Sequence, residues 1–161
     1  MDAKTYILIT DRGGHLHNAL KLVEQIGVEP GALVTTQGPD VDALVDYRCP
    51  VHRLPHLFKW FGKLRLLNPF SLLVHFGYSL YLAVNLRPRK VISLGASNVV
   101  AFCIFSRLLG AEIYHVECMN QVQHASITGR LLYPFCKTLF VQWEELLFAY
   151  GPKAQYQGWV L

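Results

Sequence analysis

Two stretches of the sequence contain residues that can move protons or bind phosphate. In the first, Gly13-Gly14-His15 follows a β-rich run at residues 4–10 and precedes an amphipathic helix pattern. Two glycines let the backbone approach a ligand closely, and the free N–H groups at a helix N-terminus suit phosphate. An imidazole beside such a turn is a candidate base or hydrogen-bond donor to phosphate. A tight strand-to-helix turn that binds nothing explains the same glycines, so both interpretations stay open.

The second stretch is the end of an apolar run at residues 111–117. This run closes on His115 and Glu117 and is followed by Asn120. Open parallel sheets bind ligands beyond the carboxyl ends of their strands, so polar side chains at a strand end indicate a site. These three residues are therefore site candidates. The alternative for Glu117 is that it only caps the next turn or accepts a structural hydrogen bond.

The order of local patterns predicts how these stretches are positioned. Helix-like patterns lie between most of the strand-like runs, which occur at residues 4–10, 32–35, 51–54, 90–94, 111–117 and 139–141. This alternation predicts a doubly wound α/β fold, with a parallel sheet and helices on both faces, in one domain of residues 1–161. A second small-residue turn, Gly95-Ala96-Ser97-Asn98, opens the helix pattern at 99–109. It points the same way as the first turn, and we expect the two turns to hold the two phosphates of a diphosphate.

Charge is distributed unevenly along this apolar chain. Hydrophobic residues make up 52% of the sequence, the net charge is +4, and the mean hydropathy is +0.26. No acidic residue occurs between Asp46 and Glu112, whereas nine Lys and Arg residues do. An anionic partner such as lipid headgroups or a diphosphate is expected, unless these cations pair with distant acids. Nucleic acid is not expected, because the cations are interleaved with bulky aliphatic groups and no motif of that class occurs.

Two apolar segments bear on attachment to a membrane. Residues 55–67 mix aromatic, leucine and basic residues and predict an interfacial helix. The residues expected at the membrane surface are Phe58, Lys59, Trp60, Phe61, Lys63 and Arg65. The uncharged segment 69–86 is short for a span and contains polar groups, so a crossover helix that lies between the sheet and solvent or a partner is predicted there. With no signal peptide or anchor evident, peripheral attachment to the cytoplasmic face is expected. The four cysteines lack metal-ligand spacing, so no metal or cofactor is expected.

The C-terminal half carries a family resemblance. The letters YHVEC at residues 114–118 and SITGRLLYPFCKTLFVQWEEL at 126–146 resemble the membrane-associated subunit of the two-part N-acetylglucosaminyltransferase that extends dolichyl diphosphate sugars. Bacterial exopolysaccharide and capsule counterparts are similar, and all are split relatives of the peptidoglycan enzyme that adds N-acetylglucosamine to lipid I. The resemblance runs from Gly13 to Gly158. It implies a Rossmann-like domain equivalent to the N-terminal, acceptor-side half of a GT-B glycosyltransferase.

The resemblance also implies roles for the site candidates. It implies a non-autonomous subunit, inactive alone, that binds a polyprenyl-diphosphate-linked sugar and forms a heterodimer with a separate UDP-sugar-binding subunit for polysaccharide or lipid-linked oligosaccharide synthesis. His15 or Glu117 would take the proton from the acceptor hydroxyl, and Asn120 would contact the acceptor sugar. The residues expected to anchor the partner are Trp143, Trp159 and Leu161.

Two other functions fit the same residues. A non-catalytic membrane adaptor would anchor and stabilise the partner transferase and contribute no reacting group. A nucleotide-binding regulatory domain would use the Gly13-Gly14 turn, although the chain lacks the GxGxxG and Walker patterns. Alanine variants of His15 and Glu117 separate the transferase subunit from the adaptor, because only the subunit loses turnover.

Overall fold

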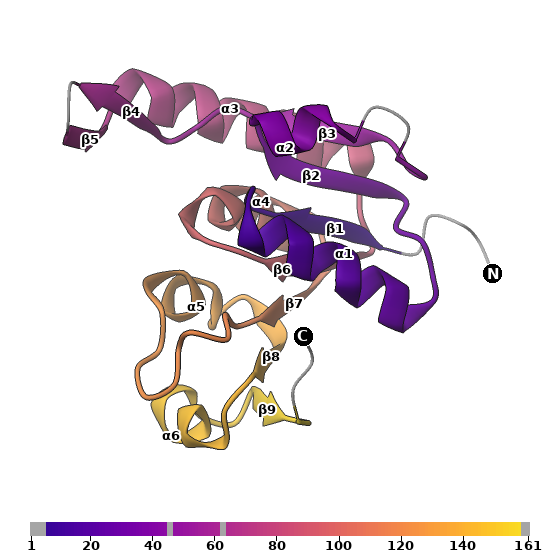
Figure 1. Ribbon diagram of the computed structural model, residues 1–161, viewed down its shortest axis with the longest axis vertical. Coiled ribbons are helices and arrows are strands. Elements are labelled where there is room, and N and C mark those ends of the chain that lie inside the picture. Colours follow the sequence, from indigo (N-terminus) through magenta and orange to yellow (C-terminus); the bar gives the residue numbers. More distant parts are fainter. Residues whose placement is uncertain (1–5, 45–46, 62–63, 159–161) are drawn as a thin grey trace.

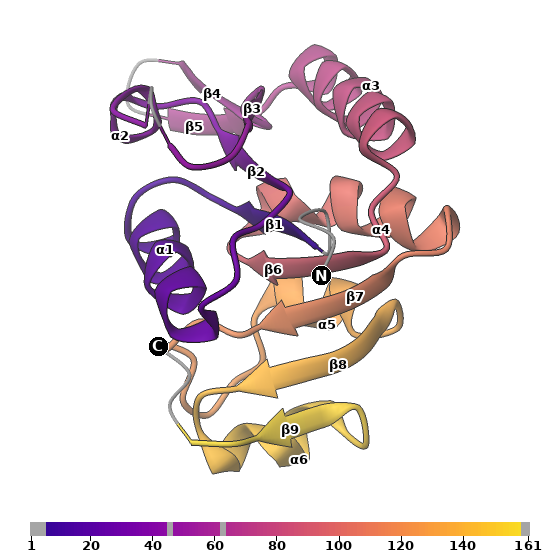
Figure 2. The same cartoon turned by 90° about the vertical axis from the view of Figure 1, so that its right-hand side faces the viewer.

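A computed structural model describes residues 6–44, 47–61 and 64–158 of the chain, and in strands β4 and β5 it describes the backbone alone. The main sheet has seven parallel strands in the order β3-β2-β1-β6-β7-β8-β9. Their bounds are β1 Ile7–Thr10, β2 Ala32–Thr36, β3 Val51–Leu54, β6 Lys90–Leu94, β7 Glu112–Val116, β8 Cys136–Val141 and β9 Ala154–Tyr156. The predicted doubly wound α/β fold is confirmed (Figures 1 and 2).

The helices connect successive strands and cover both faces of the sheet. They are α1 Gly14–Ile26, α2 Pro39–Asp42, α3 Pro69–Leu86, α4 Val100–Leu108, α5 Ile127–Leu132 and α6 Leu147–Tyr150, with 3-10 turns η1 at Ser97–Val99 and η2 at Glu144–Leu146. Residues along β1 alternate between two cores. Ile7 and Ile9 pack with Phe102 of α4, whereas Leu8 packs with Leu16 of α1. Both faces are therefore buried along this strand, as parallel sheets require.

Three adjacent strands end at the edge where the site candidates lie. Strand β6 pairs with β1 on one side and with β7 on the other, and Thr10, Leu94 and Val116 stand in register at their carboxyl ends. The chain leaves these positions into the Gly13-Gly14 turn, the turn at 95–98 and Glu117. The predicted convergence of these three segments at one sheet edge is therefore confirmed.

The predicted interfacial helix at 55–67 is wrong. The chain forms an antiparallel hairpin there, with β4 Phe58–Phe61 pairing with β5 Leu64–Leu67. Phe61 pairs with Leu64, so only two residues connect the strands, which is the commonest hairpin connection. Gly62 at this connection is also a poor helix former. The side chains of the membrane-surface candidates Phe58, Lys59, Trp60, Phe61, Lys63 and Arg65 lie outside the described part of the structure.

The crossover helix predicted at 69–86 exists, but most of it is not buried. The side chain of Asn68 caps α3 by accepting a hydrogen bond from the Ser71 N–H at 3.1 Å, and Pro69 occupies the first turn. By length and composition α3 is apolar enough to cross a membrane, yet only 28% of it is buried inside the protein. It packs against α4 through one narrow stripe. The crossover helix therefore lies with one side on the protein, and its outer side is left for solvent or a partner.

Candidate functional site

The first turn lies at the end of β1, and part of it is already occupied. Gly13 has a φ of 73°, a left-handed conformation that favours glycine, and it precedes the thirteen-residue helix α1. Its N–H donates a 2.6 Å hydrogen bond to Asp40 Oδ2 from α2. Gly14 begins α1, and His15 follows it with a partly buried side chain. An internal carboxylate therefore holds the position where an external anion was expected.

The second turn is tied directly to the first. A Cβ on Gly95 would lie 2.8 Å from the backbone nitrogen of Asp11, so only glycine permits this approach. Asn98 is buried, donates to Asp11 Oδ2 at 2.8 Å and accepts from the Leu57 N–H at 3.4 Å. Ala96 and Ser97 are partly buried beside it. The Asn98 side chain therefore joins three segments of the protein rather than presenting its amide to solvent.

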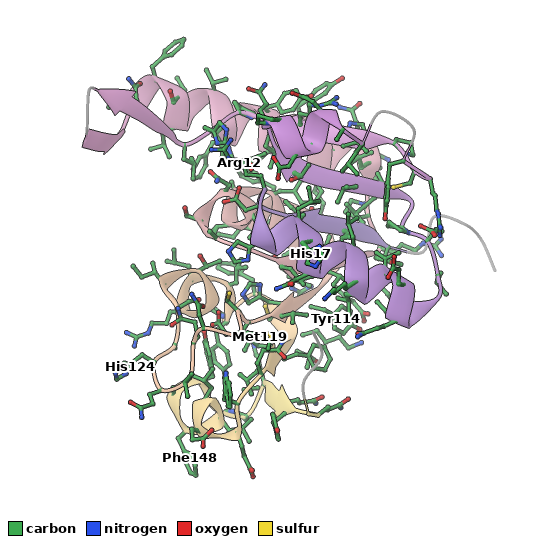
Figure 3. The ribbon with its side chains drawn as sticks, in the orientation of Figure 1. Arg12, His17, Tyr114, Met119, His124 and Phe148 are labelled. Carbon is green, nitrogen blue, oxygen red and sulfur yellow. The ribbon has the colours of Figure 1, made fainter. Side chains whose placement is uncertain are left out.

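Asp11 is a site residue that the sequence analysis missed. Its carboxylate accepts hydrogen bonds from the Thr36 hydroxyl, the Arg12 N–H and the Asn98 amide, so it links the ends of β1, β2 and β6. Its only sequence signal was its place directly before Arg12-Gly13-Gly14. Arg12 is exposed and supplies a cation at the same turn (Figure 3). The edge therefore combines acceptors for hydroxyl groups with one guanidinium able to pair with an anion.

Glu117 lies in a dense hydrogen-bond network. Its side chain is 2% exposed. Oε1 accepts from the Cys118 N–H at 3.0 Å, and Oε2 accepts from the Ser126 hydroxyl at 3.0 Å and from the Tyr150 hydroxyl. Ser126 in turn caps α5 by accepting from the Gly129 N–H at 2.8 Å. These contacts are those of the structural alternative, because both carboxylate oxygens already serve protein donors.

His115 lies on β7, two positions before Glu117, and is 1% exposed. Its Nδ1 lies 3.2 Å from the hydroxyl of Ser93, and its Nε2 has no hydrogen-bond partner among the described residues. Burial lowers the pKa of His115 to about 4, against the opposing effect of the Glu117 charge, and His15 lowers it further. The His115 imidazole therefore interacts electrostatically with both His15 and Glu117, at the end of the sheet where the site candidates lie. His115 is neutral at pH 7.

A histidine buried in its neutral form makes stability depend on pH. The unfolded chain binds a proton at the ordinary pKa of 6.5, whereas the folded protein resists it until about pH 4. Stability is therefore lost as the pH falls from 6.5 towards 4, and we expect a loss of about 2 kcal/mol between pH 7 and pH 5 from this group. Urea unfolding at both pH values measures it. His115→Leu should flatten this dependence, and a variant with the wild-type slope would contradict the assignment.

Asn120 and Trp143 lie on the loops after β7 and β8. Asn120 is exposed on the first of these loops. The indole N–H of Trp143 donates to the Met119 carbonyl oxygen at 2.7 Å, and Gln142 Nε2 donates to the Glu117 carbonyl oxygen at 3.4 Å. Trp143 thus joins the two loops and is partly buried. Trp159 and Leu161 lie outside the described residues.

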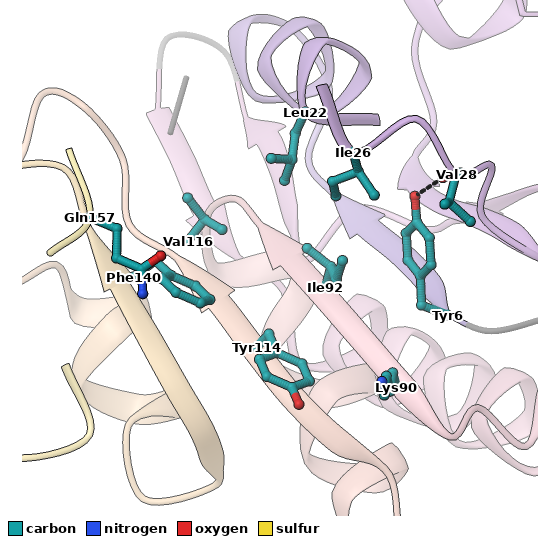
Figure 4. Close-up of a pocket in the computed structure, with 10 residues that line it drawn as sticks. All are labelled: Tyr6, Leu22, Ile26, Val28, Lys90, Ile92, Tyr114, Val116, Phe140 and Gln157. Carbon is teal, nitrogen blue, oxygen red and sulfur yellow. Dashed lines mark hydrogen bonds between the residues drawn. The ribbon is translucent and has the colours of Figure 1, made fainter. Parts of the chain in front are cut away.

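An apolar hollow of about 450 Å³ lies on the α1 side of the sheet. Figure 4 shows its floor formed by side chains of β6, β7 and β8, with α1 along one wall and Gln157 from the C-terminal segment at the other side. The lining residues are Tyr6, Leu22, Ile26, Val28, Lys90, Ile92, Tyr114, Val116, Phe140 and Gln157. No sequence pattern indicated this hollow. The hollow forms between α1 and strands β6, β7 and β8, which lie far apart in the sequence. Within the described ranges, no group of three His, Cys, Asp or Glu side chains is placed to hold a metal ion.

Comparison with known proteins identifies related chains. Residues 61–160 match the family described as oligosaccharide biosynthesis protein Alg14 like. A Yarrowia lipolytica protein named UDP-N-acetylglucosamine transferase subunit ALG14 is 31% identical over 91 residues, which are 53% of this chain and 42% of that protein. A Kluyveromyces lactis protein of the same name is 42% identical over 48 residues, or 30% of this chain and 20% of that protein. The chain thus spans less than half the length of these curated relatives.

Two solved structures share the fold. Acinetobacter baumannii MurG superimposes with a TM-score of 0.71 and 20% identity, covering 94% of this chain and 45% of that one. A glycosyltransferase from Rickettsia africae superimposes with a TM-score of 0.62 and 14% identity, covering 96% of this chain and 43% of that one. At these identities the similarity concerns the fold alone. Nearly all of this chain corresponds to less than half of each neighbour.

Proposed function

The chain belongs to the Alg14-like family of oligosaccharide biosynthesis proteins, and from this premise we propose that it is the acceptor-side subunit of a two-protein UDP-N-acetylglucosamine transferase. One observation carries the proposal. The chain matches the Alg14-like family, and its fold superimposes on less than half of the glycosyltransferase MurG. We place the UDP-sugar site on a second protein, because the curated relatives are named as subunits of the transferase. Transfer would take place in the cleft between the two proteins.

The proposed acceptor is a sugar on a polyprenyl diphosphate, bound where the two turns meet. The Gly13 N–H at the start of α1 and the exposed Arg12 support binding of a phosphate group there. Asp40 accepts the Gly13 N–H in the free protein, so a bound phosphate oxygen would replace the Asp40 carboxylate at this amide. The buried Asn98 and Asp11 would hold the two turns at a constant separation. Asn120 is exposed on the loop that follows β7, and it is the proposed contact to the acceptor sugar.

We assign the base to His15 rather than to Glu117. The Glu117 oxygens already accept hydrogen bonds in a buried network, whereas the His15 imidazole is partly accessible at the turn. In the proposed step the acceptor hydroxyl oxygen attacks the anomeric carbon of the donor sugar and its proton passes to His15. The bond between that carbon and the UDP oxygen breaks. UDP keeps the electron pair of this bond and stays bound to the partner subunit until it is released. Glu117 would position the loop and α5 beside this reaction.

Two surfaces support the proposed assembly. The apolar hollow beside the C-terminal segment suits a partner subunit, because exposed apolar concavities of this kind commonly mark interfaces. Trp143, Trp159 and Leu161 remain the proposed anchors for that partner near the chain's C-terminal end. Attachment to the cytoplasmic face of a membrane would place the site at the level of the lipid-linked acceptor. The proposed complex is thus a peripheral heterodimer.

A reconstitution assay tests the proposal. Membranes carrying a lipid-diphosphate-sugar acceptor are incubated with labelled UDP-N-acetylglucosamine and with this chain, its candidate partner, or both. Transfer only by the mixture is the expected result. Transfer by the partner alone would reduce this chain to an adaptor. Transfer by this chain alone would place the donor site within its 161 residues and overturn the division of labour.

A further inference from the structure

Helix α3 has its polar and apolar sides reversed relative to an ordinary surface helix. The stripe that packs against the protein contains Ser71, His75 and Ser79, together with Leu82 and Ala83. The opposite side, which we call the outer face, is formed by the exposed residues Phe70, Leu73, Val74, Leu80, Tyr81 and Val84. A helix exposed to water normally places its apolar side inward and its polar side outward. This arrangement is expected where the surroundings are less polar than the interior.

The inner stripe carries polar atoms that the protein does not satisfy. His75 Nδ1 donates to the Pro55 carbonyl oxygen at 2.7 Å, which leaves Nε2 buried with no partner among the described residues. The hydroxyl of Ser79 and that of Ser106 on the adjoining helix α4 are also buried, and neither has a hydrogen-bond partner within the described residues. Small and hydroxyl-bearing residues between helices are typical of packing in lipid, where bulky apolar side chains face outward.

The outer face is large and strongly exposed. Leu73 is 71% exposed and Phe70 is 69% exposed, and none of the eighteen residues of α3 is charged. The face continues towards α4, where Phe76 meets Phe105 edge-on with ring centroids 6.1 Å apart. Tyr78 and Tyr81 stack on each other with centroids 5.8 Å apart. Tyrosine is enriched at membrane–water interfaces because its ring is apolar and its hydroxyl is polar.

Charge next to the outer face identifies its partner. Arg87 and Arg89 follow α3 directly, are exposed, and take part in none of the three ion pairs found among the described residues. Lys90 comes next but stands in register with Glu112 of β7, whose pKa it helps to lower, so its charge is opposed within the protein. An apolar face beside unpaired cations is complementary to a bilayer surface, which offers acyl chains and anionic headgroups together. A second protein copy with the same cations would meet like charge here.

We propose that the outer face of α3 docks sideways on an anionic lipid bilayer, with the helix lying in the plane of the interface. The proposal rests on the proposed function, because it supplies the surface that brings the site to a membrane-bound acceptor. Eighteen residues rise about 27 Å, short of the hydrocarbon thickness of about 30 Å. The inner stripe packs along α4, so one side of α3 stays on the protein while the other enters the headgroup region. The proposed membrane surface thus lies on α3. It is next to the β4–β5 hairpin, whose residues the sequence analysis expected at the membrane.

Vesicle sedimentation with the full chain tests this surface. Wild-type protein should bind vesicles of phosphatidylcholine and phosphatidylglycerol in equal parts, and bind pure phosphatidylcholine more weakly. Leu73→Glu combined with Tyr81→Glu should lower the partition coefficient by about a hundredfold, because two charges would enter the apolar interface. Arg87→Gln combined with Arg89→Gln should lower binding to the anionic vesicles by up to roughly thirtyfold. Circular dichroism checks that each variant remains folded.

A matched control changes two exposed apolar residues on other helices. Phe148, which is 95% exposed and extends outward from α6, and Ile127 of α5 are both replaced by glutamate (Figure 3). This control should bind vesicles like the wild type. Equal loss of binding in the control, or no loss in the α3 variant, would overturn the proposal. Light scattering that showed a wild-type dimer, disrupted by the α3 variant and unable to bind vesicles, would assign the face to a second copy instead.

The two proposals fail in different experiments. The wild-type chain and its partner, assayed without membranes on a short-chain, water-soluble acceptor, test the transferase function alone. No transfer in that assay, with vesicle binding as expected, would overturn the proposed function and keep the docking face. Transfer in that assay, with no specific loss of vesicle binding in the α3 variant, would keep the proposed function and overturn the docking face.

Discussion

Replacement of His15 by alanine is expected to lower the turnover of the assembled transferase by about 10² to 10⁴-fold, the usual contribution of a positioned general base. The imidazole follows the Gly13-Gly14 turn at the start of α1 and is partly accessible there. Alanine is a good helix former, and no hydrogen bond of the His15 side chain is found among the described residues. Stability should therefore change by less than about 0.5 kcal/mol.

His17 provides the matched control for this experiment. It lies on the same helix two positions further on, and its side chain is exposed (Figure 3). His17→Ala should retain wild-type turnover with the partner, measured as initial rates on saturating lipid acceptor. Full activity of His15→Ala would remove His15 from the reaction. If His15→Ala and His17→Ala lost activity equally, a general effect on α1 would explain the loss.

Replacement of Glu117 by alanine is expected to destabilise the fold by about 3–5 kcal/mol, because several donors would lose their acceptor inside the protein. Those donors are the Cys118 N–H, the Ser126 hydroxyl and the Tyr150 hydroxyl. The loss is a large part of the 5–15 kcal/mol typical of a whole domain. It corresponds to a fall in Tm of roughly 10 °C, which calorimetry or thermal circular dichroism measures.

Two further variants define the cause of that loss. Glu145→Ala removes an exposed carboxylate from η2 and should leave Tm unchanged. Gly129→Ala disturbs the same network from the other side, because its Cβ would lie 2.5 Å from Glu117 Oε2 and would collide with the Tyr150 hydroxyl. It should destabilise the protein as well. An unchanged Tm for Glu117→Ala with turnover abolished would make Glu117 a reacting group and refute the positioning role.

Local sequence patterns were sufficient for most of the fold. The strands at 51–54 and 90–94 were predicted with the bounds that β3 and β6 have. These strands depend on residues close together in the chain, namely runs of β-branched and apolar side chains. Strand and helix alternation then leaves few alternatives to a parallel sheet.

Patterns failed where two local structures suit the same residues. Residues 55–67 have the composition of an interfacial helix, but Gly62 and a two-residue connection between apolar runs favour the hairpin that forms. The predicted secondary structure of this segment was therefore wrong, while its place at a membrane surface stays a prediction. For residues 69–86 the helix was predicted, but which side faces the protein was not, because an uncharged helix has no clear polar face to orient it.

By itself, the sequence determined the fold class, the family and the edge of the sheet where the polar residues gather, since each of these follows from short-range pattern or from similarity along the chain. Only the tertiary structure decided what those residues do to one another. Glu117 meets Tyr150 across 33 positions, and Asn98 meets Asp11 across 87. Such contacts form between segments that the sheet brings together, so no local spacing encodes them. They distinguish the partly accessible His15 from the fully engaged Glu117. Packing of α3 against α4 likewise decided which side of that helix faces outward.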